Sequence, residues 1–96
     1  MKYKSDEDKM RVALNEAKKA HDVDEVPIGA AIFDKDDNLI CANHNRRELD
    51  QNPTSHAEIL VLEEASQILG TWRLEDTTIA TLFPYTTLFR SRKSVV

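Results

Sequence analysis

The chain contains little cysteine, glycine or proline, and it has no long apolar run. Cys41 is its only cysteine, so no intramolecular disulfide can form and nothing points to an oxidising compartment. No apolar stretch approaches the roughly 20 residues of a membrane span. Residues 1–8 are largely charged or polar and lack the apolar segment of a secretory signal. We therefore expect a cytoplasmic protein.

The composition is that of one small globular domain with an uneven charge distribution. The 96 residues are 41% hydrophobic and 31% charged, which excludes disordered and fibrous classes. Residues 1–80 carry ten basic and seventeen acidic side chains, whereas residues 81–96 carry three basic and no acidic ones. An acidic body argues against general nucleic-acid affinity, which depends on neutralising phosphates. Any contact with RNA is expected to be local, or to use residues that this chain lacks.

Hydrophobic periodicity predicts two helices and three strands. Ser5 and Asp8 form a capping-box pattern before a helix over residues 6–21. Strands are expected over 28–33 and 39–42, joined by a polar turn, and a third strand begins at 77–80. A second helix starts near residue 54 and stops at Gly70. The order helix, strand, strand, helix, strand predicts a three-layer α/β domain with helices covering a sheet.

The last sixteen residues differ from the rest. Residues 81–91 match, at eleven consecutive positions, the translation of a common sequencing-library adapter. The sign of the charge also reverses here, and Pro84 lies where a central strand would continue. We therefore expect residues 1–80 to be the N-terminal part of a domain and residues 81–96 to be a non-native tail.

The tripeptide His56-Ala57-Glu58 at the start of the second helix contains two residue types that are common in catalytic sites. A neutral imidazole binds Zn²⁺ well, and a nearby carboxylate can move protons for a zinc-bound water. A bare H-x-E pattern is weak, however. Ser55 with Glu58 also forms a capping box, in which Glu58 would only bind backbone amides, and His56 could be a partly exposed first-turn residue.

Four separated blocks give this tripeptide a context. They are residues 25–30 (EVPIGA), 45–46 (NR), 52–60 (NPTSHAEIL) and 70–74 (GTWRL). In this order and spacing the blocks resemble the bacterial tRNA-specific adenosine deaminase family, within the cytidine-deaminase-like superfamily. The resemblance covers about residues 8–80 and implies a three-layer α/β/α cytidine-deaminase-like fold. It also implies a Zn²⁺ cofactor, a tRNA anticodon stem-loop as partner, and a homodimer in the intact protein.

The resemblance assigns roles by position. His56 corresponds to the first zinc ligand and Glu58 to the general acid/base. Asn45 corresponds to the asparagine that holds the substrate nucleoside, with a turn asparagine as the alternative. Ile28 corresponds to a wall of the base pocket, with plain sheet core as the alternative. Cys41 is expected to be a buried apolar residue rather than a ligand.

The sequence departs from the family after its third strand. The family continues with T-L-E-P-C-x-x-C, which supplies two zinc-binding thiolates, whereas residues 81–85 here read TLFPY and no cysteine follows. Both partner cysteines and the C-terminal elements are therefore missing, and the fold is expected to be incomplete. We expect the parent protein to deaminate adenosine to inosine at the tRNA wobble position, and this chain to be inactive. The alternatives are a guanine or cytosine deaminase of the same superfamily, and a non-catalytic α/β fragment.

Overall fold

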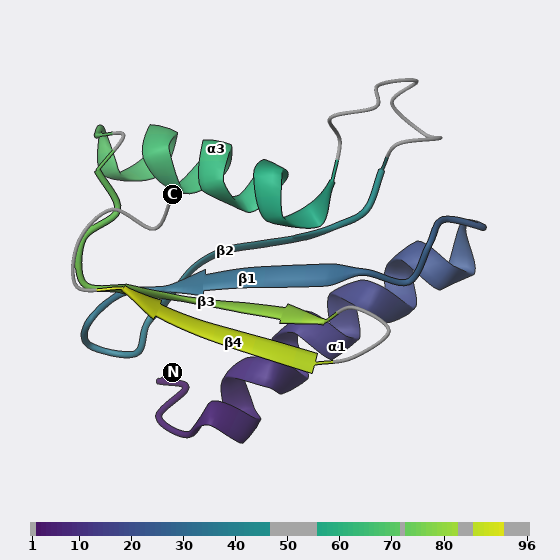
Figure 1. Cartoon of the computed structure of the whole chain (residues 1–96), viewed down its shortest axis with the longest axis horizontal. Coiled ribbons are helices and arrows are strands. Elements are labelled where there is room, and N and C mark those ends of the chain that lie inside the picture. Colours follow the sequence, from purple (N-terminus) through teal and green to yellow (C-terminus); the bar gives the residue numbers. More distant parts are fainter. Residues whose placement is uncertain (1, 47–55, 72, 83–85, 92–96) are drawn as a thin grey trace.

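The structure is a computed structural model, and it describes residues 2–46, 56–71, 73–82 and 86–91, the last of these as backbone only. Two helices and four strands lie within these ranges (Figure 1). In chain order they are α1 (Asp6–Asp22), β1 (Gly29–Phe33), β2 (Leu39–His44), α3 (Ala57–Leu69), β3 (Thr77–Leu82) and β4 (Thr86–Ser91).

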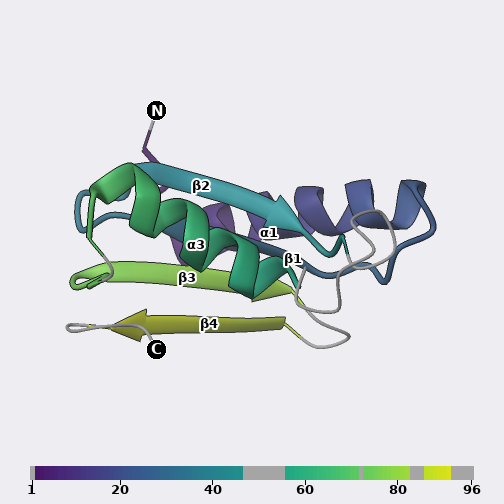
Figure 2. The same cartoon turned by 90° about the horizontal axis from the view of Figure 1, so that it is seen from above.

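The strands form one antiparallel sheet in the order β2-β1-β3-β4. Helix α3 covers one face of this sheet and α1 covers the other (Figures 1 and 2). The predicted three-layer arrangement and the order helix, strand, strand, helix, strand are both confirmed. In the part of the chain that the structure describes, neither helix is long and apolar enough to cross a membrane.

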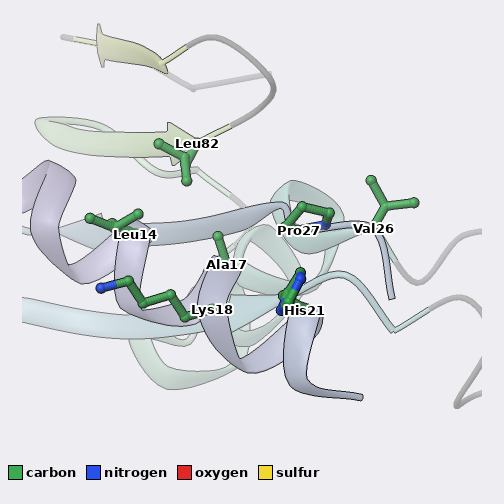
Figure 3. Close-up of a pocket in the computed structure, with 7 residues that line it drawn as sticks. All are labelled: Leu14, Ala17, Lys18, His21, Val26, Pro27 and Leu82. Carbon is green, nitrogen blue, oxygen red and sulfur yellow. The ribbon is translucent and has the colours of Figure 1, made fainter. Parts of the chain in front are cut away.

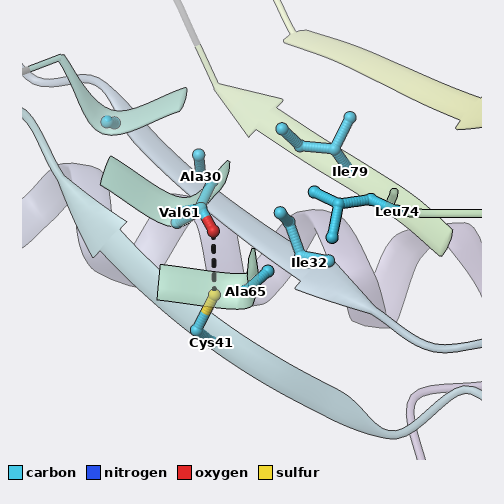
Figure 4. Close-up of a cluster of buried hydrophobic side chains, with 8 residues drawn as sticks. Ala30, Ile32, Cys41, Val61, Ala65, Leu74 and Ile79 are labelled. Atoms are coloured by element: carbon cyan, nitrogen blue, oxygen red, sulfur yellow. Dashed lines mark hydrogen bonds between the residues drawn. The ribbon is translucent and has the colours of Figure 1, made fainter. Parts of the chain in front are cut away.

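Strand β1 is the centre of the domain because every one of its residues is buried. Side chains alternate along a strand, so β1 contributes to two separate cores. Ala30 and Ile32 pack toward α3 with Cys41, Val61 and other residues (Figure 4). Ala31 and Phe33 join the cluster that includes Ala13 of α1. A strand covered on both faces accounts for the continuous apolar run at residues 28–33.

Gly29 lets α1 approach the sheet closely. A Cβ at this position would overlap the Ala13 carbonyl oxygen and would lie 2.9 Å from the Glu16 Cβ. Backbone atoms of a helix cannot move away without shifting the helix itself. The missing side chain of Gly29 therefore sets the distance between α1 and β1.

The helix starts show what local sequence can predict. The Ser5 hydroxyl accepts a hydrogen bond from the Asp8 amide at 3.0 Å, as the capping pattern predicts, and α1 ends one residue later than expected. Helix α3 begins instead at Ala57, with His56 as an N-cap that makes no side-chain cap hydrogen bond. Ser55, the expected cap, lies outside the described residues. Gly70 ends α3 with a φ of 70°, as a helix stop requires.

The third strand begins at Thr77, as expected, and runs to Leu82, and its neighbour β4 lies within the segment that the sequence sets apart. Ala80 pairs with residue 88 in this ladder. Ladder bonds are made by backbone groups that every residue except proline carries in full. The pairing therefore neither supports nor opposes a foreign origin for residues 81–96. The strand expected at 39–42 is two residues longer in the structure and ends at His44.

Candidate active site at one end of the sheet

The four residues singled out by the sequence lie at the same end of the sheet. Strand β1 begins, β2 ends and α3 begins at this end, on the right of Figure 1. Ile28 immediately precedes β1 and Asn45 immediately follows β2. His56 and Glu58 lie at the first turn of α3. The antiparallel pairing of β1 with β2 brings Ile28 and Asn45 to this end, and the packing of α3 on the sheet adds His56 and Glu58.

The last residues of β2 point alternately to the two helices. Cys41 donates its thiol hydrogen to the Val61 carbonyl of α3, and the Asn43 side-chain amide donates to Glu64 of α3 at 2.6 Å. Ala42 packs on the α1 side. His44 also faces α1, where its Nδ1 lies 3.0 Å from Glu16 Oε1. This alternation places the next residue, Asn45, on the α3 side.

Asn45 is held by its backbone and has an unsatisfied side-chain oxygen. Its amide donates to the Ile28 carbonyl at 3.0 Å, which extends the β1–β2 ladder by one bond. The residue is 2% exposed, yet its Oδ1 has no hydrogen-bond partner among the described residues. Ile28, its cross-strand neighbour, packs against the apolar cluster under α3. Asn45 is therefore a buried residue directly after the end of β2.

Glu58, like Asn45, has a buried side-chain oxygen without a hydrogen-bond partner among the described residues. It is half-buried in the first turn of α3, where the helix dipole favours a negative charge. Its Oε2 is buried and has no partner in the described part of the chain. Because His56 is the N-cap, Glu58 is the second helical residue and not the third, which a capping box requires. A capping box with Glu58 would need an N-cap one residue earlier than the observed His56.

A complete zinc centre does not fit the residues that the structure describes. A catalytic zinc site needs three protein ligands and an open position. Within the described ranges no group of three His, Cys, Asp or Glu side chains could hold a metal ion. His56 is half-buried at the helix start and remains available as one ligand. The histidines at residues 21 and 44 lie at a helix end and a strand end.

The environment of Cys41 opposes a role as a second ligand. It is 8% exposed and its thiol donates to the Val61 carbonyl oxygen at 3.3 Å (Figure 4). Burial, aided by the negative charge of Glu64, raises the pKa of the Cys41 thiol to about 12. A zinc ligand must be a thiolate, so this environment opposes metal binding. The structure agrees with the expectation of a buried apolar residue.

Sequence reasoning missed the charged cluster beside Asn45. Glu16 is 8% exposed and binds two partners, His44 through Oε1 at 3.0 Å and Lys19 through Oε2 at 2.7 Å. Burial raises the pKa of Glu16, but the hydrogen bonds from His44 and Lys19 outweigh it and lower the pKa below its ordinary value. The acid and the histidine are 28 positions apart, and no local pattern connects them.

A separate apolar groove of about 370 Å³ lies along α1 (Figure 3). It is lined by Leu14, Ala17, Lys18, His21, Val26, Pro27 and Leu82. None of the four residues singled out by the sequence lines it. The groove is therefore distinct from the candidate site.

Comparison with known proteins identifies relatives of the chain. A family model described as the cytidine and deoxycytidylate deaminase zinc-binding region matches residues 3–88. The chain is 49% identical over 74 residues to a tRNA-specific adenosine deaminase of Bacillus subtilis. That match covers 77% of this chain and 45% of the relative. The chain thus spans less than half the length of this curated relative.

Solved structures share the fold. One, from a study of A-to-I editing by tRNA:A34 deaminases at the wobble position of transfer RNA, is 38% identical with a TM-score of 0.72. The match covers 76% of this chain and 55% of that one. A guanine deaminase of Bacillus subtilis is 27% identical with a TM-score of 0.75, over 80% of this chain and 49% of that chain. The partial coverage agrees with the expected incomplete fold.

Proposed function

This chain belongs to the cytidine and deoxycytidylate deaminase family, and we propose that its parent protein hydrolytically deaminates adenosine to inosine at the tRNA wobble position. The likeness to tRNA-specific adenosine deaminases supports this choice of substrate. In the proposal, adenosine and water give inosine and ammonia. The 96-residue chain itself is proposed to be inactive, because it supplies one of the three zinc ligands that a catalytic centre needs.

The observation that carries the proposal is a pair of unsatisfied oxygens at one end of the sheet. Asn45 Oδ1 and Glu58 Oε2 are buried, and neither has a hydrogen-bond partner among the described residues. An unsatisfied buried acceptor costs about 1–3 kcal/mol, so native proteins retain few of them. Two unsatisfied acceptors at the same end of the domain support a binding site for a polar ligand there.

Each residue then has a defined task. Glu58 accepts a proton from the attacking water and delivers protons to the adenine ring and to the leaving ammonia. The Asn45 amide hydrogen-bonds the nucleoside, and Ile28 forms an apolar wall beside the base. His56 contributes one ligand to the zinc centre of the intact protein. When bound, zinc would lower the pKa of a coordinated water.

Glu58 provides the direct test. In the intact gene product, Glu58→Gln should lower inosine formation in an anticodon stem-loop by at least about 10²-fold, because a general acid–base group is lost. Zinc content by mass spectrometry should be unchanged. Glu63→Gln is the matched control, since Glu63 is an exposed acid of the same helix. Near-normal turnover by Glu58→Gln would show that Glu58 has only a structural role.

Guanine deamination is the second candidate, because a guanine deaminase shares the fold. The Asn45-Arg46 pair and residues 72–74 favour the tRNA enzyme, although Trp72 lies outside the described residues. The two activities are separated by measuring inosine in an anticodon stem-loop and ammonia release from free guanine with the same preparation. Release from guanine without inosine formation would replace the tRNA proposal.

The boundary at residue 80 belongs to the same proposal. We take residues 1–80 as the native part of a deaminase domain and residues 81–96 as a foreign tail. Amplifying the locus from source DNA should give a reading frame that continues after Ile79 into a Pro-Cys-x-x-Cys segment. An independent genomic read that contains the codons of residues 81–91 would contradict this boundary.

The assembly and location of the intact protein are proposed on the same basis. We propose a cytoplasmic homodimer that binds a tRNA anticodon arm. Light scattering of the intact protein tests the dimer, and fractionation of the source cells tests the location. A monomer with full activity would remove the dimer from the proposal.

A further inference from the structure

Strand β2 ends in a residue whose side chain is hydrogen-bonded to α1 in a part-buried contact. His44 Nδ1 lies 3.0 Å from Glu16 Oε1, and the two side chains are 15% and 11% exposed. An ionised carboxylate can only accept hydrogen bonds, so the His44 Nδ1 carries the hydrogen in this contact. Lys19 binds the other oxygen of Glu16 at 2.7 Å, which holds the carboxylate in one orientation.

The position of Gly29 makes this contact possible. Gly29 is the cross-strand partner of His44 in the β1–β2 ladder. Since Gly29 has no side chain, the α1 backbone at Ala13 and Ala17 lies directly against it, and a Cβ there would be only 2.9 Å from the Glu16 Cβ. Glu16 therefore reaches across a glycine to the histidine on the neighbouring strand.

The next residue, Asn45, lies on the other side of the sheet and carries an unsatisfied oxygen. Leaving a buried amide oxygen unsatisfied costs free energy, so other contacts must hold the strand end that carries Asn45 in place. One ladder bond, from the Asn45 amide to the Ile28 carbonyl at 3.0 Å, continues beyond His44. Because side chains alternate along a strand, fixing His44 against α1 also fixes the direction of Asn45 on the α3 side.

We propose that the Glu16–His44 pair is a positioning device for Asn45, which holds the end of β2 so that the Asn45 amide faces the substrate nucleoside. This inference rests on the proposed function for the role of Asn45. Glu16 and His44 act through the backbone and lie on the α1 side of the sheet, so neither touches the substrate. They are positioning residues rather than catalytic ones.

Hydrogen exchange on the 96-residue chain tests the structural half of the proposal. Glu16→Ala and His44→Ala should each speed exchange of the Asn45 amide at least ten-fold, because local opening of the strand end becomes easier. The amide of Ala31, in the middle of β1, should change less than two-fold. Glu16→Gln keeps an oxygen that accepts from His44 and should restore slow exchange at Asn45.

Glu7→Ala is the matched control for these variants. Glu7 lies on the same helix and pairs with Arg11 at 2.8 Å, but both side chains are exposed. This variant should leave exchange at Asn45 unchanged. The proposal is overturned if Glu16→Ala exchanges Asn45 at the control rate. It is also overturned if Ala31 accelerates as much as Asn45, since that pattern reports general destabilisation.

A double-mutant cycle in the intact gene product tests the functional half. Glu16→Ala should lower single-turnover kcat/KM for an anticodon stem-loop about ten-fold when Asn45 is present, and less than about two-fold in an Asn45→Ala background. A purely structural role would give equal factors in both backgrounds and would overturn the inference. Absence of inosine formation by the unmutated protein would refute the proposed function instead, and the exchange rates alone would then decide the role of the pair.

Discussion

The Cys41 thiol and the Val61 carbonyl oxygen are joined by a hydrogen bond of 3.3 Å that links β2 to α3. This contact lies in the apolar cluster between the sheet and the helix, where Cys41 is buried. The single thiol of the chain is therefore used for packing. It is buried and hydrogen-bonded to α3.

Cys41 should be unreactive in the folded chain. Its raised pKa of about 12 leaves little thiolate at pH 8, and burial blocks access. Alkylation by iodoacetamide, followed by mass spectrometry, should be at least about 100-fold slower in buffer than in strong denaturant. Rapid labelling of the folded chain would show that the cluster opens readily or is packed differently.

Gly29→Ala should destabilise the domain by about 1–3 kcal/mol or more, since overpacking forces backbone shifts. The added methyl group would meet the backbone of α1 at Ala13 and Ala17. Urea unfolding followed by circular dichroism measures the change. Gly70→Asn is the control, because Gly70 has a φ of 70° with nothing within 4 Å, and asparagine tolerates that conformation. Equal stability of Gly29→Ala and the parent chain would contradict the close packing of α1.

Glu16 should make stability depend on acid pH. Its pKa in the folded chain lies below the ordinary value of 4.5, so the folded state favours the charged form more than the unfolded state does. The resulting stabilisation is fully present above pH 4.5 and is lost as the pH falls through the lower, folded-state pKa. Glu16→Gln should therefore show a smaller loss of Tm between pH 6 and pH 3 than the parent chain.

The same Tm measurement on Glu7→Gln provides the comparison, because Glu7 is an exposed acid of the same helix. Removing any carboxylate alters the net charge, and this control shares that change. If Glu16→Gln and Glu7→Gln lose Tm equally with acid, the buried contacts of Glu16 do not contribute to the pH dependence.

The 96-residue chain should neither retain zinc nor form inosine. Three protein ligands are needed, and the described residues hold no group of three that could bind a metal. Metal analysis after dialysis, together with an inosine assay on an anticodon arm, measures both properties. Stoichiometric zinc with turnover would require further ligands among Cys41, His44 and His21, and would refute the proposed inactivity.

Local signals in the amino-acid sequence are enough to predict several elements of the fold. Helix α1 follows from its Ser5 cap and from apolar spacing near 3.6 residues, and its observed range differs by one residue from the expected one. The stop at Gly70 likewise needs only one left-handed residue. The start of α3 was predicted less well. The Ser55–Glu58 pattern predicts Ser55 as the N-cap, whereas the observed N-cap is His56.

The arrangement of the site was decided by tertiary structure. Sequence spacing marked Asn45 and Glu58, but their burial and unsatisfied oxygens appear only when the sheet and α3 are assembled. The pair of Glu16 and His44 joins residues 28 positions apart, and the bond from Cys41 spans 20. Periodicity reports which face of an element is apolar. It carries no information on which distant element covers that face, because this depends on strand order and on the close approach that Gly29 permits.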